Sequence, residues 1–135
     1  MTEKPVCTVV KSTETFEGKQ AFTYFAGISA QNTGATGICM HLLTIPPNGR
    51  AKAHLHQNHE TAIYMLAGEA AMWYGDGMKE HLTVKAGEYL HIPANTPHLP
   101  YNPSDSEPCT AVLARTDPNE QESVVLLPQF DSVLE

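Results

Sequence analysis

The stretch GRAKAHLHQNHETAIYMLAG, residues 49–68, contains three histidines within six positions and then a largely apolar run that ends at a glycine. On a β-strand the side chains of His54 and His56 point to the same face, about 6.5–7 Å apart. Two imidazoles in these positions can bind one metal ion at about 2.0–2.1 Å per nitrogen. The run at 61–67 alternates between two largely apolar faces and stops at Gly68, which predicts a strand directly after the histidines.

A second stretch, GEYLHIPANTPHLPYN at residues 87–102, has a related organisation. Residues 88–92 have the composition of a buried strand, and the prolines and asparagine of 93–97 predict a turn. His98 follows that turn directly. The stretch therefore predicts a strand, a turn and a further strand, with a histidine where the further strand begins.

Short apolar or alternating runs continue along the whole chain, and no long segment has the periodicity of a helix. Gly, Pro, Asn and Asp separate these runs at intervals of roughly ten residues, which is typical of an all-β sandwich or barrel. The sequence has no internal repeat and no low-complexity linker, so we expect one domain over residues 1–135. We expect strands at 5–10, 20–26, 37–45, 51–56, 61–67, 69–75, 80–85, 88–92, 97–102, 109–115 and 122–127.

The charge and hydropathy of the chain exclude several classes of partner. Its 8 Lys and Arg stand against 15 Asp and Glu, a formal net charge of −7, which disfavours nucleic acid and anionic membranes. No apolar run reaches the roughly 20 residues that span a bilayer. The first residues also lack the apolar stretch of a signal peptide, so we expect a cytoplasmic protein without nucleic-acid or membrane partners.

The second stretch resembles one of the two conserved motifs of the cupin superfamily. That motif reads G-x5-P-x-G-x2-H-x3-N, and the chain matches it at Gly87, Pro93, His98 and Asn102 with every spacing kept. Asn95 stands where the motif has its inner glycine. Asparagine tolerates the left-handed turn conformation better than other non-glycine residues, so the exchange is compatible with the motif.

The first stretch resembles the other cupin motif, which reads G-x5-H-x-H, three or four residues, then E-x6-G. The chain matches it at His54, His56 and Gly68, and Gly49 lies one residue closer to the histidines than usual. Together the two motifs imply an all-β fold, a double-stranded β-helix or jelly-roll barrel. They imply a single cupin domain with the two stretches at its core.

The resemblance also implies a metal site. The motif histidines are the ligands in this family, so His54, His56 and His98 are expected to bind one divalent transition metal ion. Imidazole nitrogens suit Fe, Mn, Ni, Zn and Cu alike, which leaves the identity of the metal open. Three protein ligands keep further positions free for water, substrate or dioxygen.

The chain departs from the family at the glutamate ligand of the first motif, because that position is occupied by Thr61. Three arrangements stay open for the fourth metal position. Water completes the site, or a β-bulge turns the neighbouring Glu60 inward, or His59 folds in as a fourth nitrogen ligand.

Three neutral imidazoles resemble the site of cupin dioxygenases that bind ferrous iron. We therefore expect a metal-dependent enzyme that acts on a small organic molecule by dioxygenase-like or isomerase-like chemistry. The alternative is a non-catalytic cupin that binds or senses a small ligand, and a barrel whose histidines bind nothing is the third possibility. The resemblance implies a homodimer. Arg50 and Arg115 are the chain's arginines, and either can bind a carboxylate if it faces the site.

Overall fold

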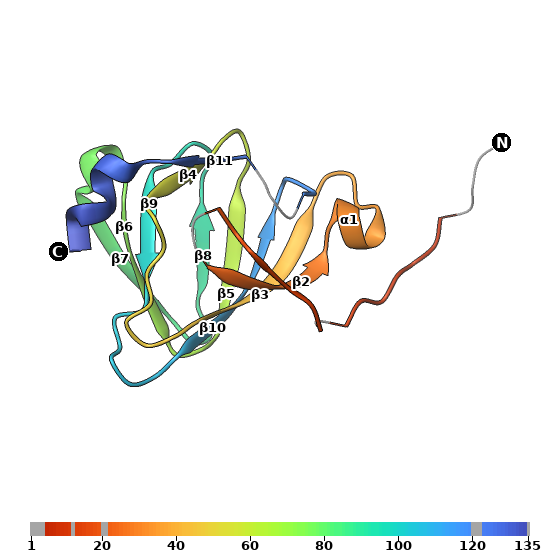
Figure 1. Ribbon diagram of the computed structural model, residues 1–135, viewed down its shortest axis with the longest axis horizontal. Coiled ribbons are helices and arrows are strands. Elements are labelled where there is room, and N and C mark those ends of the chain that lie inside the picture. The colour runs from red at the N-terminus through yellow and green to blue at the C-terminus, as the bar shows by residue number, and fades with distance from the viewer. Residues whose placement is uncertain (1–4, 12, 20–21, 120–122, 135) are drawn as a thin grey trace.

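The chain folds into two antiparallel β-sheets that face each other (Figure 1). The computed structural model describes residues 5–11, 13–19, 22–119 and 123–134. The first sheet has the strand order β1-β2-β3-β10-β5-β8 and the second the order β11-β4-β9-β6-β7. This architecture confirms the prediction of an all-β fold. The strands are β1 (Thr15–Glu17), β2 (Thr23–Ile28), β3 (Cys39–Ile45), β4 (His54–His56), β5 (Thr61–Ala67), β6 (Glu69–Tyr74), β7 (Glu80–Lys85), β8 (Tyr89–Ile92), β9 (His98–Tyr101), β10 (Cys109–Arg115) and β11 (Val124–Leu126).

The core lies between the two sheets because side chains alternate along each strand. In the central strand β10, Cys109, Ala111, Leu113 and Arg115 are buried, whereas the residues between them are partly exposed. The inward-facing row of β10 is thus apolar until its last residue, which is charged. The main buried cluster consists of Phe22, Tyr24, Leu43, Ile45, Ala51, Met65, Val84, Cys109, Ala111 and Leu113.

Two tight turns require backbone conformations that most residues avoid. Gly68, between β5 and β6, has a φ of +77°, and a Cβ there would lie 2.7 Å from the carbonyl oxygen of Pro108. Asn95, between β8 and β9, has a φ of 61°, which confirms the left-handed conformation expected for it. The backbone N–H of Asn95 donates to the carbonyl oxygen of His56 at 2.9 Å, so this turn is tied to β4.

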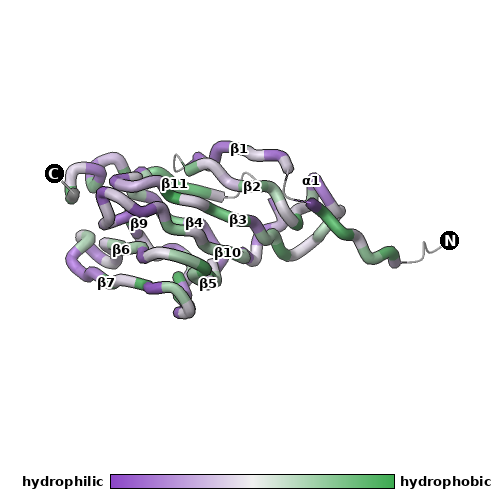
Figure 2. The backbone as a smooth tube through the Cα atoms, turned by 90° about the horizontal axis from the view of Figure 1, so that it is seen from below, coloured by the Kyte–Doolittle hydropathy of each residue, from purple (hydrophilic) through white to green (hydrophobic). Residues whose placement is uncertain are grey.

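The structure differs from the prediction near the N-terminus. The expected strand at 5–10 is absent, and most of its side chains are exposed. This segment is apolar but extends away from the sheets, as Figures 1 and 2 show. Without a neighbouring strand edge its backbone groups have no ladder partner, so apolar character alone does not make a strand. The short strand β1, which the sequence did not indicate, pairs with β2 instead. The expected strands 20–26 and 122–127 begin at residues outside the described part of the chain.

Among the described residues the helical segments are short: α1 (Ala30–Thr33), the 3₁₀ helix η1 (Asp76–Met78) and the 3₁₀ helix η2 (Pro128–Leu134). The serine before α1 caps the helix, since Oγ of Ser29 accepts a hydrogen bond from the N–H of Asn32. Over the residues that the structure describes, no helix combines the length and the apolar character needed to cross a membrane.

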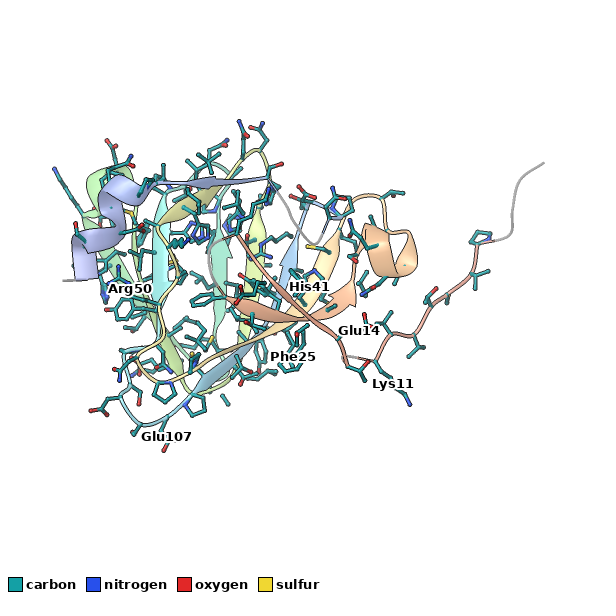
Figure 3. All side chains as sticks on the ribbon, viewed as in Figure 1. Lys11, Glu14, Phe25, His41, Arg50 and Glu107 are labelled. Carbon is teal, nitrogen blue, oxygen red and sulfur yellow. The ribbon has the colours of Figure 1, made fainter. Side chains whose placement is uncertain are left out.

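The C-terminal segment η2 closes the end of the barrel next to β4. Its apolar side chains pack on a small buried cluster formed by Ala53, Met78 and Leu99. The Asp131 carboxylate accepts a hydrogen bond from the Ala53 N–H at 2.7 Å, and the Arg50 guanidinium donates to the carbonyl oxygen of Asp131. Figure 3 shows Arg50 at this end of the molecule. These contacts hold the residues that lead into β4.

Asn102, the last residue of the second stretch, is buried and connects two loops. Its side-chain N–H groups donate to the carbonyl oxygens of Ile45 at 3.1 Å, Pro46 at 3.2 Å and Glu107 at 2.8 Å. Its Oδ1 accepts from the backbone N–H of Ser104 at 3.0 Å. The amide therefore satisfies backbone groups that are largely removed from water.

We expect Asn102→Ala to lower the free energy of unfolding by about 2–4 kcal/mol, because buried carbonyl groups lose their donors. Urea unfolding followed by the fluorescence of Trp73 measures this loss. Asn119→Ala, at an exposed position, is the control and should change stability by less than about 0.5 kcal/mol. Equal stability of the two variants would contradict the structural role of Asn102.

Candidate metal centre

Two neighbouring strands of the second sheet bring three histidines together. His54 and His56 lie on β4, and His98 begins β9. His54 and His98 are direct partners in the antiparallel register, so their side chains leave the sheet on the same face. All three histidines are buried, with 1%, 3% and 2% of their surfaces exposed in sequence order. The spacing of two residues along β4 and the pairing of β4 with β9 thus bring the three imidazole rings together.

The three rings are close enough to share an ion. One possible ligand nitrogen from each lies within 4.8 Å of the other two. The ring centroids are 4.3 Å apart for His54 and His98, and 5.0 Å apart for the other two pairs. Nitrogens that bind one ion at about 2.1 Å each lie up to about 4.2 Å apart, so small rotations close the group on a metal. Within the described ranges, no other His, Cys, Asp and Glu side chains form such a group.

Backbone contacts fix which ring nitrogen is available. Nδ1 of His54 lies 2.6 Å from the carbonyl oxygen of Lys52, and Nδ1 of His98 lies 2.8 Å from that of Thr96. A carbonyl oxygen only accepts hydrogen bonds, so Nδ1 carries the proton in both rings and Nε2 keeps its lone pair. Metal-binding histidines have this arrangement, in which the outer hydrogen bond orients the ring and fixes its tautomer.

Burial keeps these imidazoles neutral. Removal from water, with a further effect of the nearby His56, lowers the pKa of His98 to about 3. The pKa of His54 also lies well below its ordinary value, because of burial first and of His98 and His56 next. Only a neutral ring can donate its lone pair to a metal, so His54 and His98 are ready to act as ligands at neutral pH.

The histidines form part of the wall of a cavity of about 60 Å³ between the sheets. Thr61, at the start of β5, and Arg115, at the end of β10, line the cavity from the other sheet. The rest of the wall is mostly apolar and includes Met65, Met72 and Leu113. An apolar cavity with a few polar groups on its wall is typical of a small-molecule site.

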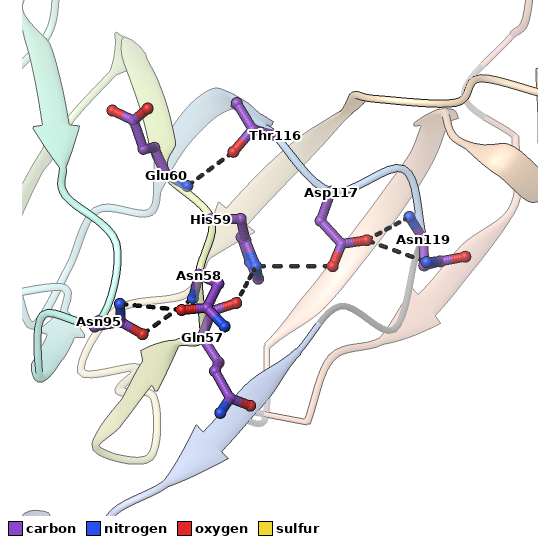
Figure 4. A network of polar contacts seen from close by, with 8 residues as sticks. All are labelled: Gln57, Asn58, His59, Glu60, Asn95, Thr116, Asp117 and Asn119. Atoms are coloured by element: carbon purple, nitrogen blue, oxygen red, sulfur yellow. Dashed lines mark hydrogen bonds and ion pairs between the residues drawn. The ribbon is translucent and has the colours of Figure 1, made fainter.

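Glu60, a candidate for the fourth metal ligand, lies outside the histidine group. Its carboxylate pairs with Nε2 of His91 at 2.8 Å, and both side chains are more than half exposed. Its backbone N–H donates to Oγ1 of Thr116 at 3.0 Å (Figure 4). Thr116 directly follows the last residue of β10. The structure therefore directs Glu60 to the surface.

His59, the other candidate, is buried beside the group, with its ring centroid 5.1 Å from that of His56. Its Nδ1 lies 3.1 Å from the carbonyl oxygen of Gln57 and 3.7 Å from the carboxylate of Asp117 (Figure 4). Its Nε2 is buried and has no hydrogen-bond partner among the described residues. His59 is thus oriented in the same way as His54 and His98, yet it does not fall within the group of three.

The remaining histidines have other partners. Nδ1 of His41 accepts a hydrogen bond from the Gly27 N–H at 3.0 Å, so its proton is on Nε2, the opposite tautomer to that of His54. Figure 3 shows His41 on the β3 side of the molecule. His81 pairs with the hydroxyl of Tyr101 at 2.8 Å, at the surface.

Two polar residues of the cavity wall carried only a weak signal in the sequence. In the sequence, Arg115 is one of two arginines that can face the site, and Thr61 differs from the family's pattern only in not being an acid. Counting in steps of two back from Arg115 gives Leu113, Ala111 and Cys109, which are all small or apolar. This alternation is the signal that indicates an inward-facing Arg115.

A family model described as a cupin domain matches residues 41–114, which is more than half of the chain and includes all three histidines. The chain belongs to the cupin family. This cupin is 38% identical to quercetin 2,3-dioxygenase from Bacillus subtilis (strain 168) over 53 residues, which are 39% of this chain and 15% of that protein. The cupin therefore spans only a small part of that relative's length.

Solved structures have the same fold as this cupin. A variant of oxalate decarboxylase from Bacillus subtilis has a TM-score of 0.70 at 23% identity, over 87% of this chain and 31% of that one. A protein from Klebsiella pneumoniae with a double-stranded β-helix domain has a TM-score of 0.64 at 16% identity, over 90% and 85% of the two chains. These likenesses confirm the predicted double-stranded β-helix.

The stability of the metal-free cupin should fall as the pH falls below 6.5. Unfolded histidines take up protons near pH 6.5, whereas His98 stays neutral in the folded state down to about pH 3. The unfolded state then binds more protons, which costs about 1.4 kcal/mol per pH unit for each such histidine. Urea unfolding with a chelator at pH 7.5, 6 and 5 measures the slope, and His98→Gln should reduce it. A stability that does not change over this window would contradict the buried, neutral state of His98.

Proposed function

We propose that this cupin binds one divalent transition metal ion through His54, His56 and His98. The observation that carries the proposal is the buried group of three ring nitrogens on the wall of a cavity. Fe, Mn, Ni, Zn and Cu are the candidates, because imidazole suits all of them. Oxalate decarboxylase from Bacillus subtilis, whose solved structure shares the fold, has Mn(II) centres.

We further propose that the cupin is a metal-dependent enzyme acting on a small organic molecule, with dioxygenase-like or isomerase-like chemistry. A bound ion would supply Lewis acidity and open coordination positions for a substrate. His54 and His98 are pre-oriented by their Nδ1 hydrogen bonds, and the mostly apolar wall limits the access of water to the cavity. The likeness to quercetin 2,3-dioxygenase supports this proposal over part of the chain.

Elemental analysis of the purified protein tests the metal site. The wild type should carry about one transition metal ion per chain, and the His54→Ala, His98→Ala double variant should carry none, because one nitrogen alone binds weakly. His41→Ala is the matched control: it also removes a buried histidine, but one of the opposite tautomer, and it should keep the metal. A wild type that stays metal-free after reloading with each candidate ion would refute the proposal.

We propose that water or substrate, rather than Glu60, completes the metal site. Because the Glu60 carboxylate pairs with His91 at the surface, Glu60→Gln should keep both the metal stoichiometry and the affinity within about twofold of the wild type. Competition with a coloured chelator measures the affinity. A loss of about tenfold or more, the usual effect of disturbing a metal site, would show that Glu60 turns inward on metal binding.

A non-catalytic, ligand-binding role is the second candidate. One observation favours it: the described residues of the cavity wall include no Asp, Glu or Lys, and no histidine other than the three of the group. Metal-loaded protein that binds a small ligand without consuming dioxygen or converting the ligand would support this role. Turnover by the wild type that is lost in the His54→Ala, His98→Ala double variant would support the enzymatic function.

We also propose a cytoplasmic homodimer with residues 1–135 as one cupin domain. Large apolar side chains on or next to the first sheet support an interface there, since Met40, Leu66 and Tyr89 are 42%, 49% and 81% exposed. Light scattering after size-exclusion chromatography gives the oligomeric state directly.

A further inference from the structure

A segment near the N-terminus leaves the body of the molecule with its apolar side chains exposed. This segment, the arm, consists of residues 5–10 and extends away from both sheets (Figures 1 and 2). Val6 and Val9 are 83% and 94% exposed. Among the described residues, no strand forms a backbone hydrogen bond with the arm. Valine and threonine favour strands, so the arm has the composition of a strand that still needs a neighbour.

The outer face of the first sheet carries a continuous apolar row. Residues paired directly in an antiparallel register share a face, and such pairs link β2, β3, β10, β5 and β8. The row consists of Phe25, Leu42, Val112, Tyr64 and Tyr89. Its members are partly or largely exposed, whereas the residues on either side of Val112 along β10 are buried in the core. The first sheet therefore has apolar side chains on both faces, and its outer face also favours a cover.

A groove of about 290 Å³ lies between the arm and one end of this row. Thr8 and Val10 of the arm form one side of the groove. Leu42 and Val112 of the row and Met40, which is 42% exposed, lie on the sheet side. The described residues that line the groove include no Asp, Glu, Lys or Arg. The groove therefore suits an uncharged, apolar occupant.

We propose that two copies of the chain exchange their arms, so that the arm of each copy packs in the groove of the other. A second copy is the occupant because the chain carries both complementary parts, an apolar arm outside its own body and an apolar groove. In a twofold arrangement the two identical contacts form together.

The charge of the chain is compatible with this arrangement. The net charge is −7, but neither the arm nor the described lining of the groove contains Asp, Glu, Lys or Arg. The contact thus brings no like charges next to each other. This inference rests on the proposed homodimer and adds the segments that hold the two copies together.

Three single variants, each of which adds one Asp, test the exchange by sedimentation equilibrium. Val9→Asp in the arm and Met40→Asp in the groove should each raise the dimer dissociation constant by about a hundredfold or more. Each places a carboxylate in an apolar contact that occurs twice per dimer. Val125→Asp is the control, because Val125 is 38% exposed on β11 of the second sheet and the charge change is the same. Its dissociation constant should stay within about threefold of the wild type.

An equal mixture of Val9→Asp and Met40→Asp shows whether the arm reaches another copy. In a mixed dimer, the intact arm of the Met40→Asp chain meets the intact groove of the Val9→Asp chain. One of the two contacts is then restored, so the mixture should associate about tenfold more tightly than either variant alone. An arm that packs in the groove of its own chain would give no such gain.

The outcomes separate this inference from the proposed homodimer. A wild type that stays monomeric refutes the homodimer and the exchange together. If the wild type is a dimer that Val9→Asp weakens no more than Val125→Asp does, or if mixing the two variants gives no gain, the exchange is refuted and the homodimer stands. Circular dichroism checks the folding of each variant. Should Met40→Asp fail to fold, the comparison of Val9→Asp with Val125→Asp decides, because the arm lies outside the core.

Discussion

The pairing of β4 with β9 is the constraint on which the candidate site depends. In this antiparallel register His54 lies opposite His98, and the period of two along β4 adds His56 to the same face. A slip of one residue between the strands would turn His98 away from the other two rings. The turn at Asn95 and the contacts of η2 hold both strands at this point, so the register is fixed from two sides.

Burial gives the same histidines their chemical character. Removed from water, His54 and His98 stay neutral, and backbone carbonyls two residues earlier in the chain hold their Nδ1 protons. This arrangement lowers the stability of the metal-free protein in acid, because protons then favour the unfolded chain. The same arrangement favours metal binding at neutral pH. The cost in stability and the capacity to bind a metal therefore have one physical origin.

The two sheets contribute different chemistry to the cavity. The second sheet supplies the imidazoles, whereas the first supplies a buried cation and a buried hydroxyl, Arg115 and Thr61. The apolar remainder of the wall strengthens electrostatic interactions inside the cavity, because apolar side chains exclude water.

The sequence by itself determined the all-β class, most strands, the family and the three histidines that meet, because these depend on local alternation, turn residues and fixed spacings. Other features depended on which segments became neighbours in space. The apolar segment 5–10 forms no strand because no edge lies beside it, and Glu60 faces the surface, where it pairs with His91. Arg115 acquired its place on the cavity wall only through the pairing of β10 with β5. A charged residue is placed by its tertiary partners, since hydropathy alone predicts it at the surface.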